Sequence, residues 1–265
     1  MPERLQDSNK GTFGKVLNFS GSKNYIGAAY LSSVSVLKTG GGFVALSTEK
    51  NIIQSVSTLL PEAIYLSRKE GLNDIKNYTV VLIGCGLGLT LSSKNLFKKV
   101  LKRLKDSEIP IIIDADGLNI LSQIKIDIPK NTIITPHPKE AARLLGVSLE
   151  TVLEDTNFCA RQLQQKYNCV VVLKTHRTII CDKDNLFVNQ HGNSALAKAG
   201  TGDVLAGTIA GLCAQKMSVY EAAKLGVYLH SIAAEIASKE GSEFSLLASE
   251  LPNYIAKAIK LLVES

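Results

Sequence analysis

Short apolar runs alternate with longer helical patterns along this chain, and no other feature of the sequence restricts the fold as much. Most of the apolar runs are continuous, as expected for strands that are buried on both faces of a sheet. Strands separated by helices form a mostly parallel sheet, because each helix carries the chain back across one face. We therefore predict an α/β fold in three layers, with a mostly parallel central sheet and helices on both faces.

The predicted elements follow from the apolar pattern and from the glycine, proline and polar residues that interrupt it. Strands are predicted at 16–19, 43–46, 80–83, 110–113, 133–134, 170–174, 178–181 and 186–188. Helices are predicted at 26–37, 96–104, 140–145, 149–167, 203–215, 219–239 and 251–263. The last two strands can pair as a hairpin. With no internal repeat and no low-complexity linker, we predict a single domain over residues 1–265.

Polar residues and glycines gather where the predicted strands end. These strand ends carry Gly21-Ser22, Gly84 to Gly88, Asp114 to Asn119, Thr135 to His137 and Lys174 to Arg177. In a parallel sheet the carboxyl ends of the strands meet at one edge, where such folds bind their ligands. We therefore expect these segments to form one composite site.

The chain is basic, with a formal net charge of +6 and a pI near 9.0, so anionic ligands such as nucleotides suit it. The lysines are scattered, and the densest run, at 98–105, has helical spacing. We interpret that run as a solvated helix face and predict no nucleic-acid partner.

Cysteine usage and apolar run length bear on the compartment. The five cysteines are odd in number, widely spaced and without a CxxC pair, which indicates reduced thiols rather than disulfides or a zinc site. The first residues are polar and lack the apolar core of a signal peptide. No apolar run approaches the roughly 18 residues of a membrane span. We expect a cytoplasmic protein without a membrane partner.

The segment 192–207 carries the clearest chemical signal. Ala199, Gly200, Thr201 and Gly202 are small and directly precede an apolar helix that begins at Asp203. Free N–H groups at a helix start bind anions, and glycine lets the backbone approach a phosphate closely. A carboxylate at that position can accept a proton from a hydroxyl group that attacks phosphorus. Without these surroundings, a simple helix-capping role for Asp203 would have about even odds.

Two familiar phosphate-binding patterns do not fit the sequence. A P-loop requires GxxxxGK followed by Ser or Thr, whereas Lys198 lies between Ala197 and Ala199. The glycines at 84, 86 and 88 have GxGxG spacing, which is not the dinucleotide fingerprint.

Several ordered motifs resemble one family within the ribokinase-like superfamily, the ADP- or ATP-dependent NAD(P)H-hydrate dehydratases. The resemblance covers about residues 10–262 and includes the 192–207 segment, which looks like the superfamily's anion-hole motif. The other matching motifs are Gly21-Ser22 with 25–29, Pro61-Glu62, 84–88, 114–119, 135–140 with Arg143-Leu144, and 172–174. Each motif is weak alone, but their order and spacing together are specific.

The resemblance implies a ribokinase-like three-layer sandwich and a repair reaction. A nucleotide phosphorylates the ring hydroxyl of the S-form of hydrated NADH or NADPH, and phosphate then leaves. Asp203 would be the base, and the N–H groups of 199–202 would hold the phosphoryl group. The segment Lys174, Thr175, His176, Arg177 and Thr178, with Gly202, would bind ADP or ATP. Ala28, Gly86, Gly88 and His137, with Asp203, would contact the hydrated dinucleotide.

Mg²⁺ is expected as a bridge between nucleotide phosphates, with no direct protein ligand. Glu140 and Asp116 are candidates to orient its waters, with ordinary helix-start or turn roles as the alternative. Three positions depart from the family pattern: Ala199 replaces a glycine, Thr175 follows Lys174 where glycine is usual, and Cys85 stands where proline is common. We interpret Cys85 as a packing residue, because nothing nearby suggests a lowered thiol pKa.

The remaining histidines receive simpler interpretations. His176 faces solvent, His191 lines the entrance of the site, and His230 packs against the sheet from the middle of a helix.

Two other functions compete with the dehydratase. A vitamin-precursor kinase of the same superfamily would share the fold and the aspartate but would release a phosphorylated product. Such kinases tend to carry Asn where this chain has His137. A nucleotide-sensing module without catalysis is less favoured, because Asp203 and the glycines are present.

Partners are also expected from the resemblance. The family forms homo-oligomers, often tetramers, and the apolar stripes of the first and last helices would suit such contacts. About ten residues precede the first motif, too few for the epimerase domain that many relatives carry, so we expect a separate epimerase.

Overall fold

The computed structural model describes residues 1–2 and 7–264 of the chain. Its strands form one nine-stranded sheet in the order β3-β2-β1-β4-β5-β6-β7-β8-β9. The strands are β1 (Lys15–Phe19), β2 (Phe43–Thr48), β3 (Ile64–Ser67), β4 (Val80–Ile83), β5 (Ile111–Ile113), β6 (Thr132–Ile134), β7 (Val170–Leu173), β8 (Ile179–Cys181) and β9 (Leu186–Val188). All pairings from β3 across to β7 are parallel, and β7-β8-β9 is an antiparallel meander. The predicted mostly parallel sheet and its terminal hairpin are confirmed.

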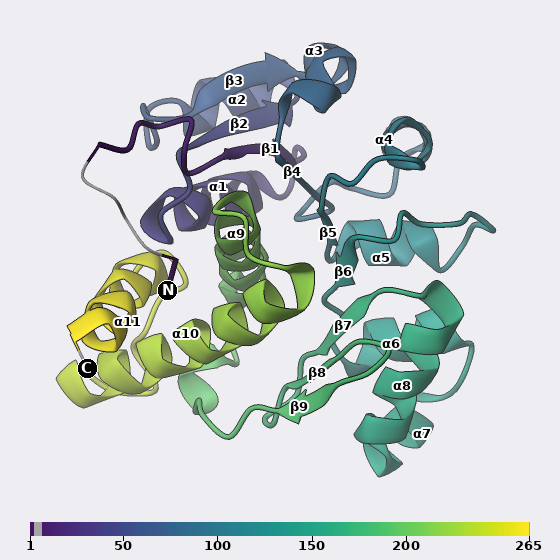
Figure 1. Cartoon of the computed structure of the whole chain (residues 1–265), viewed down its shortest axis with the longest axis vertical. Coiled ribbons are helices and arrows are strands. Elements are labelled where there is room, and N and C mark those ends of the chain that lie inside the picture. Colours follow the sequence, from purple (N-terminus) through teal and green to yellow (C-terminus); the bar gives the residue numbers. More distant parts are fainter. Residues whose placement is uncertain (3–6, 265) are drawn as a thin grey trace.

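Helices cover both faces of this sheet (Figure 1). They are α1 (Ile26–Lys38), α2 (Lys50–Val56), α3 (Arg68–Asp74), α4 (Leu91–Leu104), α5 (Asp116–Leu121), α6 (Pro138–Leu145), α7 (Leu149–Glu154), α8 (Thr156–Tyr167), α9 (Thr201–Ala214), α10 (Val219–Glu240) and α11 (Leu251–Glu264). None of the helices in the described part of the chain is both long and apolar enough to span a membrane.

Alternate residues of each strand face opposite layers, as a pleated strand requires. Val16 and Leu82 belong to the core beneath α1, α9 and α10, whereas Leu17 and Val81 belong to the core beneath α4, α6 and α8. All four side chains are fully buried. Because both faces are covered, the strands read as continuous apolar runs, and this explains why the sequence predicted them well.

The strand order reverses beside β1, because the chain builds β2 and β3 on one side and then returns to place β4 on the other. A crevice forms at the carboxyl ends of the strands at such a reversal. The loops after β1, β4, β5, β6 and β7 all lie at this edge, and α9 begins opposite them.

Among the described residues, the sequence analysis missed one strand, three α-helices and two short 3-10 helices (Ile75–Asn77 and Ser194–Leu196), and it merged two α-helices into one. Strand β3 and helices α2, α3 and α5 were not predicted, because each is short and lacks a clear apolar period. The predicted helix 149–167 is two helices, α7 and α8. Asp155 separates them and caps α8 by accepting a hydrogen bond from the Phe158 N–H at 2.9 Å. Helix α4 begins at Leu91 rather than 96, where the Thr90 side chain caps it.

Candidate active site

Helix α9 begins at a glycine turn that presents backbone N–H groups. Gly200 is the residue before the helix and has φ +94°, a left-handed conformation that favours glycine. A Cβ atom at Gly200 would lie 2.7 Å from Leu31 Cδ1 and 3.0 Å from Ala248 Cβ, so a larger residue would require neighbouring side chains to shift. The first-turn N–H groups, including those of Gly202 and Asp203, have no partner inside the helix and carry its positive dipole end. The N–H groups of Gly202 and Asp203 therefore suit an anion such as a phosphoryl group, whereas the Thr201 N–H, also predicted for the anion hole, already donates to the Lys198 carbonyl oxygen at 3.4 Å.

The hydroxyl of Thr201 ties this start to the preceding turn. Its Oγ1 donates to the carbonyl oxygens of Leu196 at 2.8 Å and Lys198 at 2.9 Å. Ala199 lies exposed in the same turn. These hydrogen bonds hold the short segment 196–200 against the start of α9.

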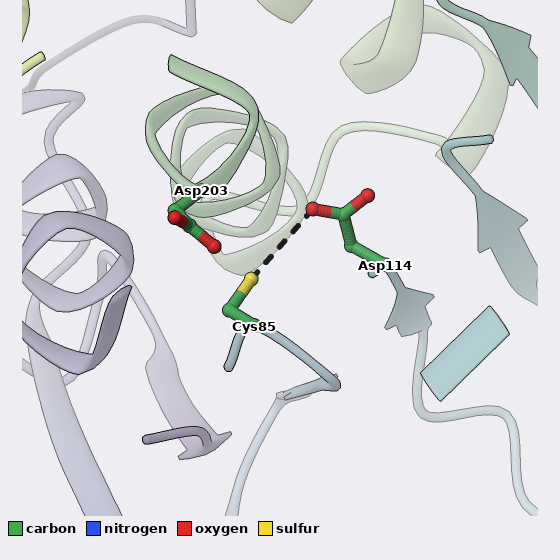
Figure 2. Close-up of side chains that lie close together, drawn as sticks. All are labelled: Cys85, Asp114 and Asp203. Carbon is green, nitrogen blue, oxygen red and sulfur yellow. Dashed lines mark hydrogen bonds between the residues drawn. The ribbon is translucent and has the colours of Figure 1, made fainter. Parts of the chain in front are cut away.

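Asp203 lies in the first turn of α9 and faces two side chains from the sheet edge, Cys85 after β4 and Asp114 after β5 (Figure 2). Their ligand atoms all lie within 4.8 Å of one another. Burial, followed by the nearby Asp114, raises the pKa of Asp203 from 3.8 to about 7, although Cys85 and Lys174 act in the opposite direction. A carboxylate with a pKa near neutrality is suited to accept a proton at physiological pH.

Asp114 and Lys174 form an ion pair beside the anion site. Lys174 Nζ lies 2.7 Å from Asp114 Oδ1, which also accepts a hydrogen bond from Thr135 Oγ1 at 2.7 Å. Burial alone would lower the pKa of Lys174, but Asp114 and Glu140 together raise it above its usual value. Lys174 therefore stays charged, and a Cβ at Gly202 would lie only 3.4 Å from its ammonium.

The cluster of Cys85, Asp114 and Asp203 has the spacing of a metal site, but its chemistry favours another role. The Cys85 thiol is fully buried, and burial raises its pKa well above the usual value. A thiol binds metal as a thiolate, so this cysteine is a poor ligand. The Lys174 ammonium already supplies Asp114 with a positive partner. The absence of a lowered thiol pKa at Cys85 is confirmed.

His137 and Glu140 form a reciprocal cap at the start of α6. The Glu140 N–H donates to His137 Nδ1 at 3.2 Å, and the His137 N–H donates to Glu140 Oε2 at 2.9 Å. Burial raises the pKa of Glu140 to about 7, while Lys174 partly opposes this shift. The pKa of His137 is lowered, first by burial and then by Lys174. The charges of Asp114 and Lys174 therefore affect the pKa values of both side chains. Glu140 has the helix-start role that the sequence analysis gave as its alternative.

Of the residues expected to contact the dinucleotide, Ala28 and Gly86 lie close together at the carboxyl ends of β1 and β4, whereas His137 lies at the start of α6, after β6. Gly86 has φ +58°, and a Cβ placed there would lie 2.8 Å from that of Ala28 and 2.5 Å from that of Tyr25. The Gly88 N–H donates to Asp116 Oδ2 at 2.7 Å. Asp116 therefore braces the glycine loop, which is a structural role for a residue that the sequence suggested as a possible metal-water partner.

Arg68 is a contributor to this edge that the sequence analysis missed. Its Nη2 donates to the carbonyl oxygens of Gly21 at 3.1 Å and Leu87 at 3.4 Å, and its Nη1 lies 3.1 Å from Glu49 Oε1. The guanidinium thus joins the loops after β1 and β4. The sequence offered little to identify Arg68, because it directly follows β3 and that short strand was not predicted.

The expected nucleotide segment divides into two parts. Lys174 points into the site, whereas Thr175, His176, Arg177 and Thr178 form the turn between β7 and β8. Thr175 Oγ1 donates to the Arg177 carbonyl oxygen at 2.7 Å and accepts from the Arg177 N–H at 3.2 Å. Thr178 Oγ1 donates to the Thr175 carbonyl oxygen at 3.1 Å. Local hydrogen bonds fix this turn, and His176 is exposed as expected.

The outcome for the other two histidines is mixed. His191 is exposed, lies edge-on to Tyr228 and places Nδ1 3.5 Å from Glu235 Oε1. His230 is buried, but its Nε2 contacts the Thr201 carbonyl oxygen at 2.9 Å rather than merely packing on the sheet. The predicted burial in mid-helix is therefore confirmed, and the sequence gave no sign of the additional contact, because Thr201 lies 29 positions away.

Asp203, the anion hole, Lys174, His137 and Glu140 therefore gather around one edge of the sheet. Asp114 and Thr135 belong to the same cluster, although the sequence analysis gave them no individual role. The sequence shows only that both residues directly follow predicted strands. This places them at the carboxyl ends of the strands but does not show which side chains they contact.

The comparisons with known proteins agree with this geometry. Residues 16–257 match the model of the NAD(P)H-hydrate dehydratase family. The chain is 36% identical over 256 residues to the ADP-dependent (S)-NAD(P)H-hydrate dehydratase of Neisseria meningitidis, covering 94% of this chain and 86% of that protein. It is 38% identical over 256 residues to the bifunctional NAD(P)H-hydrate repair enzyme of Coxiella burnetii, covering 95% of this chain and 51% of that protein. The chain thus spans about half the length of several curated relatives that it matches.

Solved structures extend the comparison. The ADP/ATP-dependent NAD(P)H-hydrate dehydratase of Bacillus subtilis, co-crystallised with ATP and Mg²⁺, matches with a TM-score of 0.87 and 33% identity, covering 98% of this chain and 94% of that one. A hydroxyethylthiazole kinase from Pyrococcus horikoshii matches with a TM-score of 0.68 but only 18% identity over 94% of this chain and 89% of that one, which shows a shared fold alone. The ribokinase-like fold class is confirmed.

Proposed function

Because the chain belongs to the NAD(P)H-hydrate dehydratase family, we propose that it restores NADH and NADPH from the S-form of their hydrates in a nucleotide-dependent reaction. The observation that carries the proposal is the Asp203 carboxylate, which lies in the first turn of α9 with a pKa raised to about 7. Such a base beside an anion site suits phosphoryl transfer to a hydroxyl group.

In the first step the ring hydroxyl of the hydrate attacks the terminal phosphorus of ADP or ATP. Asp203 accepts the hydroxyl proton, and the nucleotide leaves with one phosphate fewer. The first-turn N–H groups of α9 hold the transferring group, and the Lys174 ammonium, close to Gly202, offsets its negative charge.

In the second step phosphate replaces hydroxide as the leaving group. The carbon–oxygen bond breaks as the lone pair of the ring nitrogen moves toward the ring carbon. Loss of a proton from the neighbouring carbon then completes the double bond. Phosphate leaves far more readily than hydroxide, so the protein needs to supply little beyond the first step.

Mg²⁺ would fit beside the nucleotide through water rather than through direct side-chain ligands. Glu140 is buried, with Oε2 bound to the His137 N–H and Oε1 3.5 Å from His137 Nε2. Asp116, whose Oδ2 accepts from the Gly88 N–H, is therefore the candidate that we propose to orient such waters. A bound Mg²⁺ would supply positive charge to the phosphates.

We further assign the dinucleotide to the edge near Ala28, Gly86, Gly88 and His137, and the nucleotide to Lys174 and the 175–178 turn. ADP is the preferred co-substrate, which is supported by the name of the Neisseria relative. The chain is proposed to act as a single domain over residues 1–265, in the cytoplasm, as a homotetramer, with a separate epimerase that supplies the S-form. The continuous nine-stranded sheet supports the single domain.

The test is an absorbance assay on prepared hydrated NADH, with ADP and ATP supplied separately, each with Mg²⁺. We expect the absorbance of the reduced nicotinamide to return only with a nucleotide. Asp203→Asn should slow this by about 10²- to 10⁴-fold, the usual contribution of a general base, whereas Asp106→Asn, which removes an exposed carboxylate after α4, should not. If absorbance does not return and a vitamin precursor is phosphorylated instead, the chain is a kinase of the same fold.

A further inference from the structure

Helix α10 holds the segment that leads into the anion hole through a row of polar side chains. Three of them are spaced four and three residues apart and so share one face of the helix. The hydrogen bonds run from Asn189 Nδ2 to Ser231 Oγ (2.9 Å), from the Gly192 N–H to Glu235 Oε1 (2.8 Å) and from Asn193 Nδ2 to Ser238 Oγ (2.9 Å). Residues 189–193, which lead to α9, are therefore attached along helix α10 by hydrogen bonds.

His230, next to this row, reaches the anion hole itself. Its side chain is buried, with 7% of the residue exposed, and its Nε2 lies 2.9 Å from the Thr201 carbonyl oxygen. Burial lowers the pKa of His230 to about 4, so the ring is neutral at physiological pH. Because a carbonyl oxygen can only accept a hydrogen bond, Nε2 carries the ring proton and donates a hydrogen bond to the Thr201 carbonyl oxygen.

This hydrogen bond has a consequence on the other side of the same peptide unit. The carbonyl of Thr201 and the N–H of Gly202 belong to one planar group, and in a trans peptide they point in opposite directions. The Thr201 carbonyl already accepts inside α9, and the His230 hydrogen bond holds it a second time from outside the helix. Fixing the carbonyl in this way also fixes the direction of the Gly202 N–H, one of the first-turn donors of α9. Gly202 has no side chain that could hold this peptide from its own side.

We propose that His230 is a positioning residue that orients the anion hole of this chain by holding the Thr201–Gly202 peptide from helix α10. The inference rests on the proposed function, since it gives His230 a role in stabilising the transferring phosphoryl group. His230 touches neither nucleotide nor hydrate, and it acts through the backbone N–H that does. Hydrogen-bond donors in such sites act strongly only when they are held in place before the charge develops.

The test compares His230→Leu, which removes the donor and keeps the volume, with His230→Gln, which keeps a donor near the same place. We expect His230→Leu to lower kcat by about 10- to 100-fold, because small misplacements in a reacting geometry have effects of this size. The KM values for ADP and for the hydrate should stay within about twofold, since ground-state contacts remain. His230→Gln should recover most of the loss.

A matched control separates positioning from stability. Leu229→Ala removes a fully buried side chain from the same helix, in the core and away from the anion hole. It should lower the unfolding midpoint at least as much as His230→Leu while keeping kcat. Equal losses of kcat in the Leu and Gln variants, or a kcat loss in Leu229→Ala that matches His230→Leu, would overturn the assignment.

A binding measurement keeps this inference separate from the proposed reaction. AMP with aluminium fluoride, a mimic of the transferring phosphoryl group, should bind His230→Leu about tenfold more weakly than wild type, whereas ADP alone should bind both equally. If wild type fails to dehydrate the hydrate but this pattern holds, the proposed function fails and the role of His230 stands. Equal binding of the mimic to both proteins refutes the role of His230, whatever reaction the chain performs.

Discussion

Replacing Asp203, the proposed base, should remove a pH-dependent loss of stability at the same time as it slows the reaction. In the folded chain the pKa of Asp203 is raised from 3.8 to about 7, mainly by burial. At a pH between these two pKa values, Asp203 is charged in the unfolded chain but protonated in the folded chain. The wild type therefore loses stability as pH rises from about 4 to about 7, and the loss is complete above the folded pKa.

The magnitude follows from the size of this shift. At about 1.36 kcal/mol for each pKa unit, the wild type carries a penalty of about 4 kcal/mol at pH 8 and less than half of that at pH 5. Asn cannot ionise, so Asp203→Asn escapes this penalty. We expect the stability advantage of the variant over the wild type to grow by about 2.5 kcal/mol between pH 5 and pH 8. Hydrogen bonds that the amide gains or loses add a constant offset at both pH values and do not change this growth.

Urea denaturation of wild type and Asp203→Asn at pH 5 and pH 8 measures this difference directly. Asp106→Asn, at an exposed position after α4, is the matched control and should show no pH-dependent advantage. A constant difference between wild type and Asp203→Asn at the two pH values would refute the argument that burial disfavours the Asp203 charge.

Three further predictions use the same geometry. Dehydration at saturating substrate should rise about tenfold from pH 6 to pH 8, because the base must be deprotonated and the pKa of Asp203 is about 7; a flat pH–rate profile would contradict this. Lys174→Met should destabilise the fold by about 3–5 kcal/mol in urea denaturation by leaving Asp114 buried and unpaired, and Asp114→Leu in the same chain should restore part of it. Arg68→Met should destabilise the fold by about 1.5–3 kcal/mol in urea denaturation, because it removes charge-assisted hydrogen bonds that join the loops after β1 and β4; an unchanged stability would count against this role.

The start of α9 and the family were predictable because they depend on local sequence. The glycines around Thr201 and the carboxylate at Asp203 directly specify a helix start with free N–H groups. The parallel sheet was equally readable, since strands buried on both faces leave continuous apolar runs such as that at 80–83. Short elements such as β3 and α5 were missed because their stability comes from packing rather than from a periodic pattern.

Contacts between distant positions were decided only by the tertiary structure. The sequence placed Asp114 and Lys174 at strand ends, but their 2.7 Å ion pair spans 60 positions and depends on how β5, β6 and β7 lie side by side. The hydrogen bond from His230 to Thr201 likewise requires α10 to pack across the start of α9. Local patterns determine which groups this chain can offer, whereas the strand order and helix packing determine which of them meet, because a contact depends on position in space and not on separation along the chain.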